Sequence, residues 1–172
     1  MDLARVQAVM GPVPRLDPSG FTDFTGSLDK HEQQRLNKAR TSFTRTFPQI
    51  NVYVVFSRFR TDFPIPVTLF WMFNLGGLGI EDQKLGNNRD LFIAVDPQQS
   101  LAAVTTGYGL EPYLCAETID DILEQTSSYF QTGDLASAVV KLMQHLSQTL
   151  KKVARELPIN SEGQLQTAQA DY

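Results

Sequence analysis

Two apolar segments, Asp90–Asp96 and Ser100–Thr106, are separated by only three residues, Pro97-Gln98-Gln99. Both segments are predicted to be strands, and so short a connection forces them into an antiparallel hairpin. The hairpin lies inside the stretch Asn87–Glu111, in which a polar loop precedes the first strand and a Gly-X-Gly turn follows the second. Because this stretch gathers a backbone turn and several oxygen ligands at the ends of two buried strands, we expect a site there.

Helical segments and one further strand surround the hairpin. Ile50–Ser57 is rich in β-branched and aromatic residues, which is typical of a buried strand. Apolar residues recur at helical spacing at about Asp29–Phe47, Glu117–Phe130 and Asp134–Leu157. Ser27 is expected to cap the first of these helices and Pro48 to end it. The order of elements predicts a three-layer α/β/α sandwich, in which helices cover both faces of a small mixed β-sheet.

The length of 172 residues fits a single domain with a sizeable core. Residues 1–26 are rich in Pro, Gly, Asp and Ser and are predicted to be an extended lead-in. The domain is expected to occupy residues 27–158. Residues 159–172 are predicted to form a flexible polar tail after Pro158.

Composition excludes several classes of protein. The net charge is −4 and no basic stripe occurs, so a nucleic-acid partner is not expected. Cys115 is the only cysteine, which excludes an intramolecular disulfide and a thiolate metal cluster. The start of the chain lacks the basic and apolar regions of a signal peptide. The chain is therefore expected to be either cytosolic or a trimmed soluble piece of a longer protein.

The longest apolar run, Phe63–Leu75, is too short and too rich in proline to span a bilayer. It is predicted to be a helix, because prolines are tolerated in the first turn and Gly76-Gly77 follows it. An exposed helix of this composition would be a patch for a partner or a membrane surface. A helix packed on the sheet would be core, which is the reading we favour because its large aromatic residues cannot all share one side.

The usual catalytic motifs are missing, and the two histidines do not form a ligand spacing. Oxygen ligands remain, at the ends of predicted strands and helices. Carboxylates, amides and carbonyls are the ligand set of Ca²⁺ or Mg²⁺. The candidate ligands are Asp82, Asn87, Asn88, Asp90, Glu111 and Asp134. In the turn Gly107-Tyr108-Gly109, the glycines are expected to supply positive φ, and Glu111 is expected to cap or support the helix that follows.

Three segments together resemble the TPM domain, a family that includes thylakoid-lumen phosphatase-like proteins and many bacterial exported proteins. They are Asn87–Ile93, the turn Gly107-Tyr108-Gly109-Leu110-Glu111, and Tyr129–Leu135. The resemblance implies an α/β/α sandwich with a site at one end of the sheet, and residence outside the cytoplasm, in a periplasm or lumen. It also implies either a divalent cation with weak phosphatase activity, or an assembly or repair role at membrane complexes.

The chain departs from the family pattern where the acidic loop is expected. The family has Asp-Asn-Gly at the positions of Asn87-Asn88-Arg89, so one carboxylate is lost and a cation is gained. Position by position, the resemblance carries a Ca²⁺ or Mg²⁺ site onto Asn87, Asn88, Glu111 and Asp134, with Asp90 as a local addition. We therefore favour a non-catalytic interaction or assembly module that binds a subunit of a membrane-protein complex. The alternative is a divalent-cation-dependent phosphatase.

Overall fold

The computed structural model describes residues 8–11, 14–75 and 88–156. Strands β1 (Phe21–Asp23), β2 (Asn51–Phe56), β3 (Asp90–Asp96) and β4 (Leu101–Thr106) form a mixed sheet in the order β1-β2-β3-β4. The first three strands are parallel, with Phe21 opposite Val54 and Asn51 opposite Asp90. Strand β4 runs antiparallel to β3, so the predicted hairpin is confirmed.

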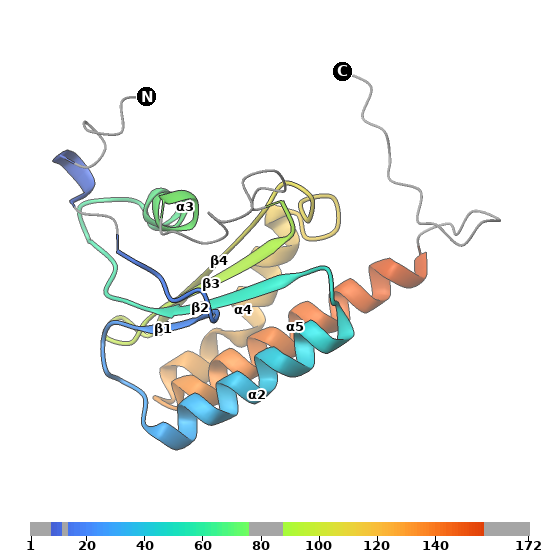
Figure 1. Cartoon of the computed structure of the whole chain (residues 1–172), viewed down its shortest axis with the longest axis horizontal. Coiled ribbons are helices and arrows are strands. Elements are labelled where there is room, and N and C mark those ends of the chain that lie inside the picture. Colours follow the sequence, from blue (N-terminus) through green and yellow to red (C-terminus); the bar gives the residue numbers. More distant parts are fainter. Residues whose placement is uncertain (1–7, 12–13, 76–87, 157–172) are drawn as a thin grey trace.

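Helices cover both faces of this sheet, as predicted. Helices α2 (Lys30–Thr46), α4 (Ala116–Gln131) and α5 (Leu135–Glu156) pack on one face, and α3 (Ile65–Leu75) covers the other (Figure 1). Every residue of β3 is buried, so this strand is the centre of the core. Helices α2 and α5 run in the same direction and end at the same end of the molecule (Figure 1). None of the helices in the described part of the chain has the length and hydropathy to cross a membrane.

Two local expectations need correction. The cap of α2 is Asp29 and not Ser27, because Asp29 Oδ1 accepts a hydrogen bond from the Glu32 amide at 2.8 Å. Glu32 in turn accepts from the Asp29 amide, which completes a capping box and satisfies two amide groups of the first turn. Strand β1 was not predicted at all, since it consists of three residues within the segment predicted to be an extended lead-in. The domain limits at residues 26 and 158 stay predictions.

Candidate functional site

The loop before β3 is held by β2 on one side and by the end of β4 on the other. The backbone amide of Asn51 donates to the carbonyl of Arg89 at 3.3 Å, and Asn51 Nδ2 donates to Asp90 Oδ1 at 2.8 Å. The amide of Gly107 donates to the carbonyl of Asp90 at 2.9 Å. These bonds bring the polar loop and the glycine turn together at the amino ends of the parallel strands, as the sequence predicts for one end of the sheet.

The turn after β4 is anchored in the core by Leu110 and Leu114, which are both buried. A Cβ atom at Gly109 would lie 2.7 Å from the carbonyl oxygen of Asn88, so this position requires glycine for close approach. The expectation of positive φ is wrong for Gly109, whose φ lies outside the left-handed region. Glu111 does not cap α4 either, because the N-cap is Cys115.

Asp90 is a buried carboxylate at this end of the sheet, with 4% of its surface exposed. Burial raises the pKa of Asp90, and the hydrogen bond from Asn51 offsets part of that rise. Burial also raises the pKa of Tyr53, and the Asp90 charge adds to the effect. The low polarity that raises both pKa values also strengthens any polar contact made here.

A pocket of about 610 Å³ opens beside the loop and the turn. Its walls come from the end of α2, the last turns of α5, the loop before β3 and the turn after β4, so segments far apart in the sequence meet here. The lining residues are Phe47, Gln49, Ile50, Arg89, Gly109, Leu110, Tyr113, Leu150, Val153 and Ala154. This volume is in the range of about 300–1,000 Å³ that is typical of small-ligand sites.

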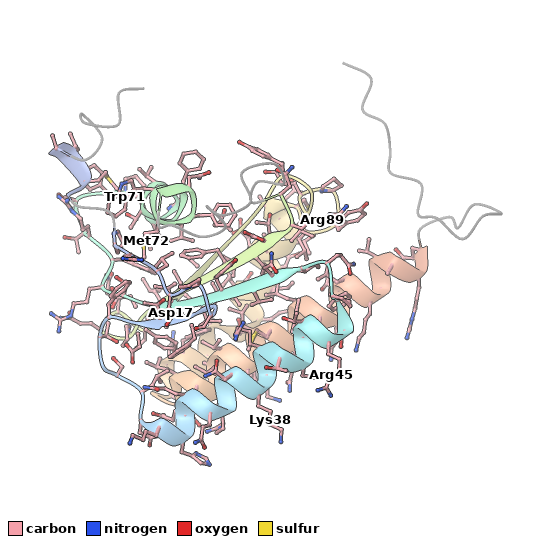
Figure 2. The ribbon with its side chains drawn as sticks, viewed as in Figure 1. Asp17, Lys38, Arg45, Trp71, Met72 and Arg89 are labelled. Carbon is pink, nitrogen blue, oxygen red and sulfur yellow. The ribbon has the colours of Figure 1, made fainter. Side chains whose placement is uncertain are left out.

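Arg89 supplies the only charge among the described residues that line the pocket. Figure 2 shows Arg89 beside the turn that follows β4, whereas Lys38 and Arg45 point away from the sheet. Among the described residues Arg89 has no ion-pair or hydrogen-bond partner for its guanidinium. A free guanidinium at the edge of an apolar pocket is suited to hold an anionic group by two parallel hydrogen bonds.

Asp134 lies at the other end of the molecule. It immediately precedes α5, and Leu150 on the pocket wall is sixteen residues further along that helix. At the rise of an α-helix this separation is about 24 Å. Asp134 accepts hydrogen bonds from the Ser137 amide at 3.0 Å and from the Ser137 hydroxyl at 2.6 Å. These bonds lower the pKa of Asp134. The carboxylate therefore caps the first turn of α5.

We expect Asp134→Ala to lower the free energy of unfolding by about 1 kcal/mol, because the amide of Ser137 loses its acceptor. Asp134→Asn keeps an oxygen acceptor and loses only the exposed ion pair with Arg35, at 3.9 Å, so its stability should stay close to that of the wild type. Urea denaturation followed by circular dichroism measures both changes. An asparagine variant as unstable as the alanine variant would contradict the capping role.

The other predicted ligands divide into two groups. Asn88, Asp90 and Glu111 lie at one end of the sheet, on the loop and turn joined by the Gly107 hydrogen bond. Asp82 and Asn87 lie outside the described residues. Within the described ranges, His, Cys, Asp and Glu side chains do not gather in threes around one point. The predicted set also contains asparagine oxygens, and the Ca²⁺ or Mg²⁺ site stays a prediction.

Sequence reasoning missed two carboxylates at the carboxyl ends of the parallel strands. Asp96 accepts from the amide of Phe59 at 2.7 Å and from the amides of Gln98 and Gln99. Asp23 accepts in the same way from the amides of Thr25, Gly26 and Leu28. Aspartate followed by turn residues was the available signal. Both carboxylates are occupied by backbone amides of neighbouring loops, so they are not available to bind a ligand. The pocket at the amino ends of the strands is therefore the better candidate site.

The fold and the pocket define a small α/β sandwich domain with a candidate site at the amino ends of its parallel strands. The family model of the TPM domain matches residues 21–149, which is more than half of the chain. The chain belongs to the TPM domain family.

Two solved structures are similar to the chain. One is the N-terminal domain of a protein from P. gingivalis, with 20% identity and a TM-score of 0.66, covering 84% of this chain and 96% of that one. The other is the N-terminal domain of a Corynebacterium glutamicum protein, with 19% identity and a TM-score of 0.54, covering 76% and 78%. Both likenesses support the fold alone. The search of curated proteins finds no match.

Proposed function

We propose that this TPM domain is an interaction module that binds a protein subunit of a membrane-associated complex outside the cytoplasm. The observation that carries the proposal is the outer face of α3. This helix has no charged residue, and it presents Val67 and Phe70 to solvent with 46% and 59% of their surfaces exposed. Spaced three residues apart, the two side chains are neighbours on one helical face.

The same helix also contributes to the core, as expected, because its inner face is buried while Val67 and Phe70 on its outer face are exposed. Leu69, Met72 and Phe73 are buried against the sheet, and the Phe73 ring lies 5.9 Å from that of Phe92. The inner face therefore fixes the helix in place. Arg60 covers the Phe63 ring at 4.7 Å, but Val67 and Phe70 are left uncovered. Because about half of each side chain is already covered, burying the remainder against a partner contributes about 1–1.5 kcal/mol each.

Photo-crosslinking in the native cell tests the proposal. A photoreactive phenylalanine analogue at position 70 is expected to crosslink the protein to one integral membrane protein. The matched control carries the analogue at the exposed Gln34, on α2 and therefore on the opposite side of the sheet. The same products from both positions, or none from position 70, would count against a docking face on α3.

The alternative, a divalent-cation-dependent phosphatase, is supported by Asn88, Asp90 and Glu111 lying at one end of the sheet. We rank it second because Arg89 places a positive charge between Asn88 and Asp90. Hydrolysis of p-nitrophenyl phosphate with Mg²⁺ or Ca²⁺ separates the two proposals. Metal-dependent turnover that is lost in Glu111→Gln and kept in Asp134→Asn would favour the phosphatase.

A further inference from the structure

The pocket beside Arg89 is separate from the α3 face, since it is built by the ends of α2 and α5 on the other side of the sheet. Most of its wall is apolar, with Phe47, Ile50, Leu110, Leu150 and Val153 among the lining residues. A ligand that fits must therefore combine an apolar body with a group that complements the positive charge. A carboxylate on an apolar chain meets both requirements.

The backbone of the adjacent turn adds hydrogen-bond donors. Within the described part of the chain, the amides of Tyr108 and Gly109 donate to no acceptor, whereas those of Gly107 and Leu110 do. Gly109 lines the pocket, and a Cβ atom there would lie 3.6 Å from Arg89 Cγ. A free amide such as that of Gly109, beside a guanidinium, is a recurring means of capturing a terminal carboxylate.

A carboxylate on an apolar chain could belong to a peptide C-terminus or to a fatty acid, and Gln49 helps to distinguish the two. Gln49 lines the pocket, and among the described residues its side-chain amide has no hydrogen-bond partner. A side-chain amide can both donate to and accept from a peptide group, which a fatty acid lacks. Gln49 therefore favours a polypeptide over a lipid.

We propose that this pocket binds the C-terminal segment of a partner polypeptide, with Arg89 pairing with the terminal carboxylate and the apolar wall holding the last side chains. The inference rests on the proposed function, a binding module, and adds a second contact to it. Gln49 bonds the peptide backbone, and specificity comes from the free carboxylate.

The test uses an N-acetylated hexapeptide that ends in two leucines, its C-terminally amidated twin, and decanoate. Each is titrated into the protein while backbone amide signals are followed by NMR. We expect the free acid to shift the signals of Gly109, Leu110, Val153 and Ala154, and to bind at least about tenfold more tightly than the amide. Arg89→Gln should weaken binding of the acid by about tenfold and make acid and amide equal, and Arg89→Lys should fall between.

Lys38→Gln is the matched control, because Lys38 is an exposed cation that points away from the sheet (Figure 2). It should leave both affinities unchanged. Equal binding of acid and amide by the wild type, no binding of either peptide, or tighter binding of decanoate would each overturn the proposal. The acid–amide comparison needs no variant, so it holds even if Arg89→Gln fails to fold. Crosslinking from position 70 without peptide binding would overturn this inference alone and leave the proposed function standing.

Discussion

Replacing Gly20 by alanine is expected to lower the free energy of unfolding by about 3 kcal/mol. Gly20 has a φ of 94°, and an added Cβ would lie 2.8 Å from the carbonyl oxygen of Val52. The Arg40 side chain, 2.6 Å from the same point, can move away, but the Val52 carbonyl belongs to β2. Relief of the clash must shift Gly20, whose own carbonyl accepts from the Val54 amide at 2.9 Å. The substitution therefore detaches the start of β1 from β2.

Gly26→Ala is the matched control for Gly20→Ala. Gly26 also has positive φ, at 63°, but an added Cβ would meet nothing within 4 Å. Alanine at position 26 should cost only the strain of a left-handed residue, about 1 kcal/mol. Urea denaturation of both variants, followed by circular dichroism, separates the cost of positive φ, which both share, from the cost of the contact with Val52, which only Gly20→Ala has. Equal losses in the two variants would show that the contact with Val52 has no energetic weight.

The main elements of the fold follow from local pattern. The short predicted connection at Pro97-Gln98-Gln99 allows only a hairpin, and the structure pairs Leu91 with Thr106 accordingly, although Ser100 also belongs to the turn and not to β4. Apolar residues at helical spacing likewise place α5 at Leu135–Glu156, within a residue of the predicted limits. Strand β1 could not be found in this way, because three residues are too few to show an alternating pattern. Its pairing with β2 depends on the turn at Gly20, which is a tertiary effect.

The candidate site was predictable only in part. The loop before β3 and the turn after β4 are close in sequence, and the hairpin between them brings them to one end of the sheet. The pocket, however, also needs Gln49 after α2 and Val153 near the end of α5. No local pattern relates those positions, because their meeting depends on α2 and α5 packing in parallel. Asp134 is predicted to belong to the site as an oxygen ligand at a helix end and as a match to the family pattern, but the packing of α5 places it at the far end.

Asp96→Ala is expected to lower the free energy of unfolding by about 3 kcal/mol, because it leaves the buried amide of Phe59 and three partly buried donors of Gln98 and Gln99 without an acceptor. Asp96 is 1% exposed and accepts from three backbone amides, including that of Phe59 at 2.7 Å, and from Gln99 Nε2 at 2.8 Å. These bonds join the loop after β2 to the turn after β3. Denaturation in urea at neutral pH measures the loss. The control is Glu124→Gln, an exposed carboxylate on α4 that should leave stability unchanged.

The contribution of Asp96 to the free energy of unfolding should also depend on pH, and it should decrease as the pH falls. Burial raises the pKa of Asp96, but the hydrogen bonds from Phe59, Gln99 and Gln98 outweigh burial and set it below the ordinary value of 3.8. Because the pKa is lower in the folded than in the unfolded chain, the stabilisation is complete above the unfolded value and is lost as pH falls through the folded value. The stability difference between wild type and Asp96→Asn should therefore be constant from neutral pH down to about pH 5 and shrink below about pH 4. A difference that stays constant to the acid limit would mean that the charge of Asp96 contributes nothing, and that its oxygens act only as neutral acceptors.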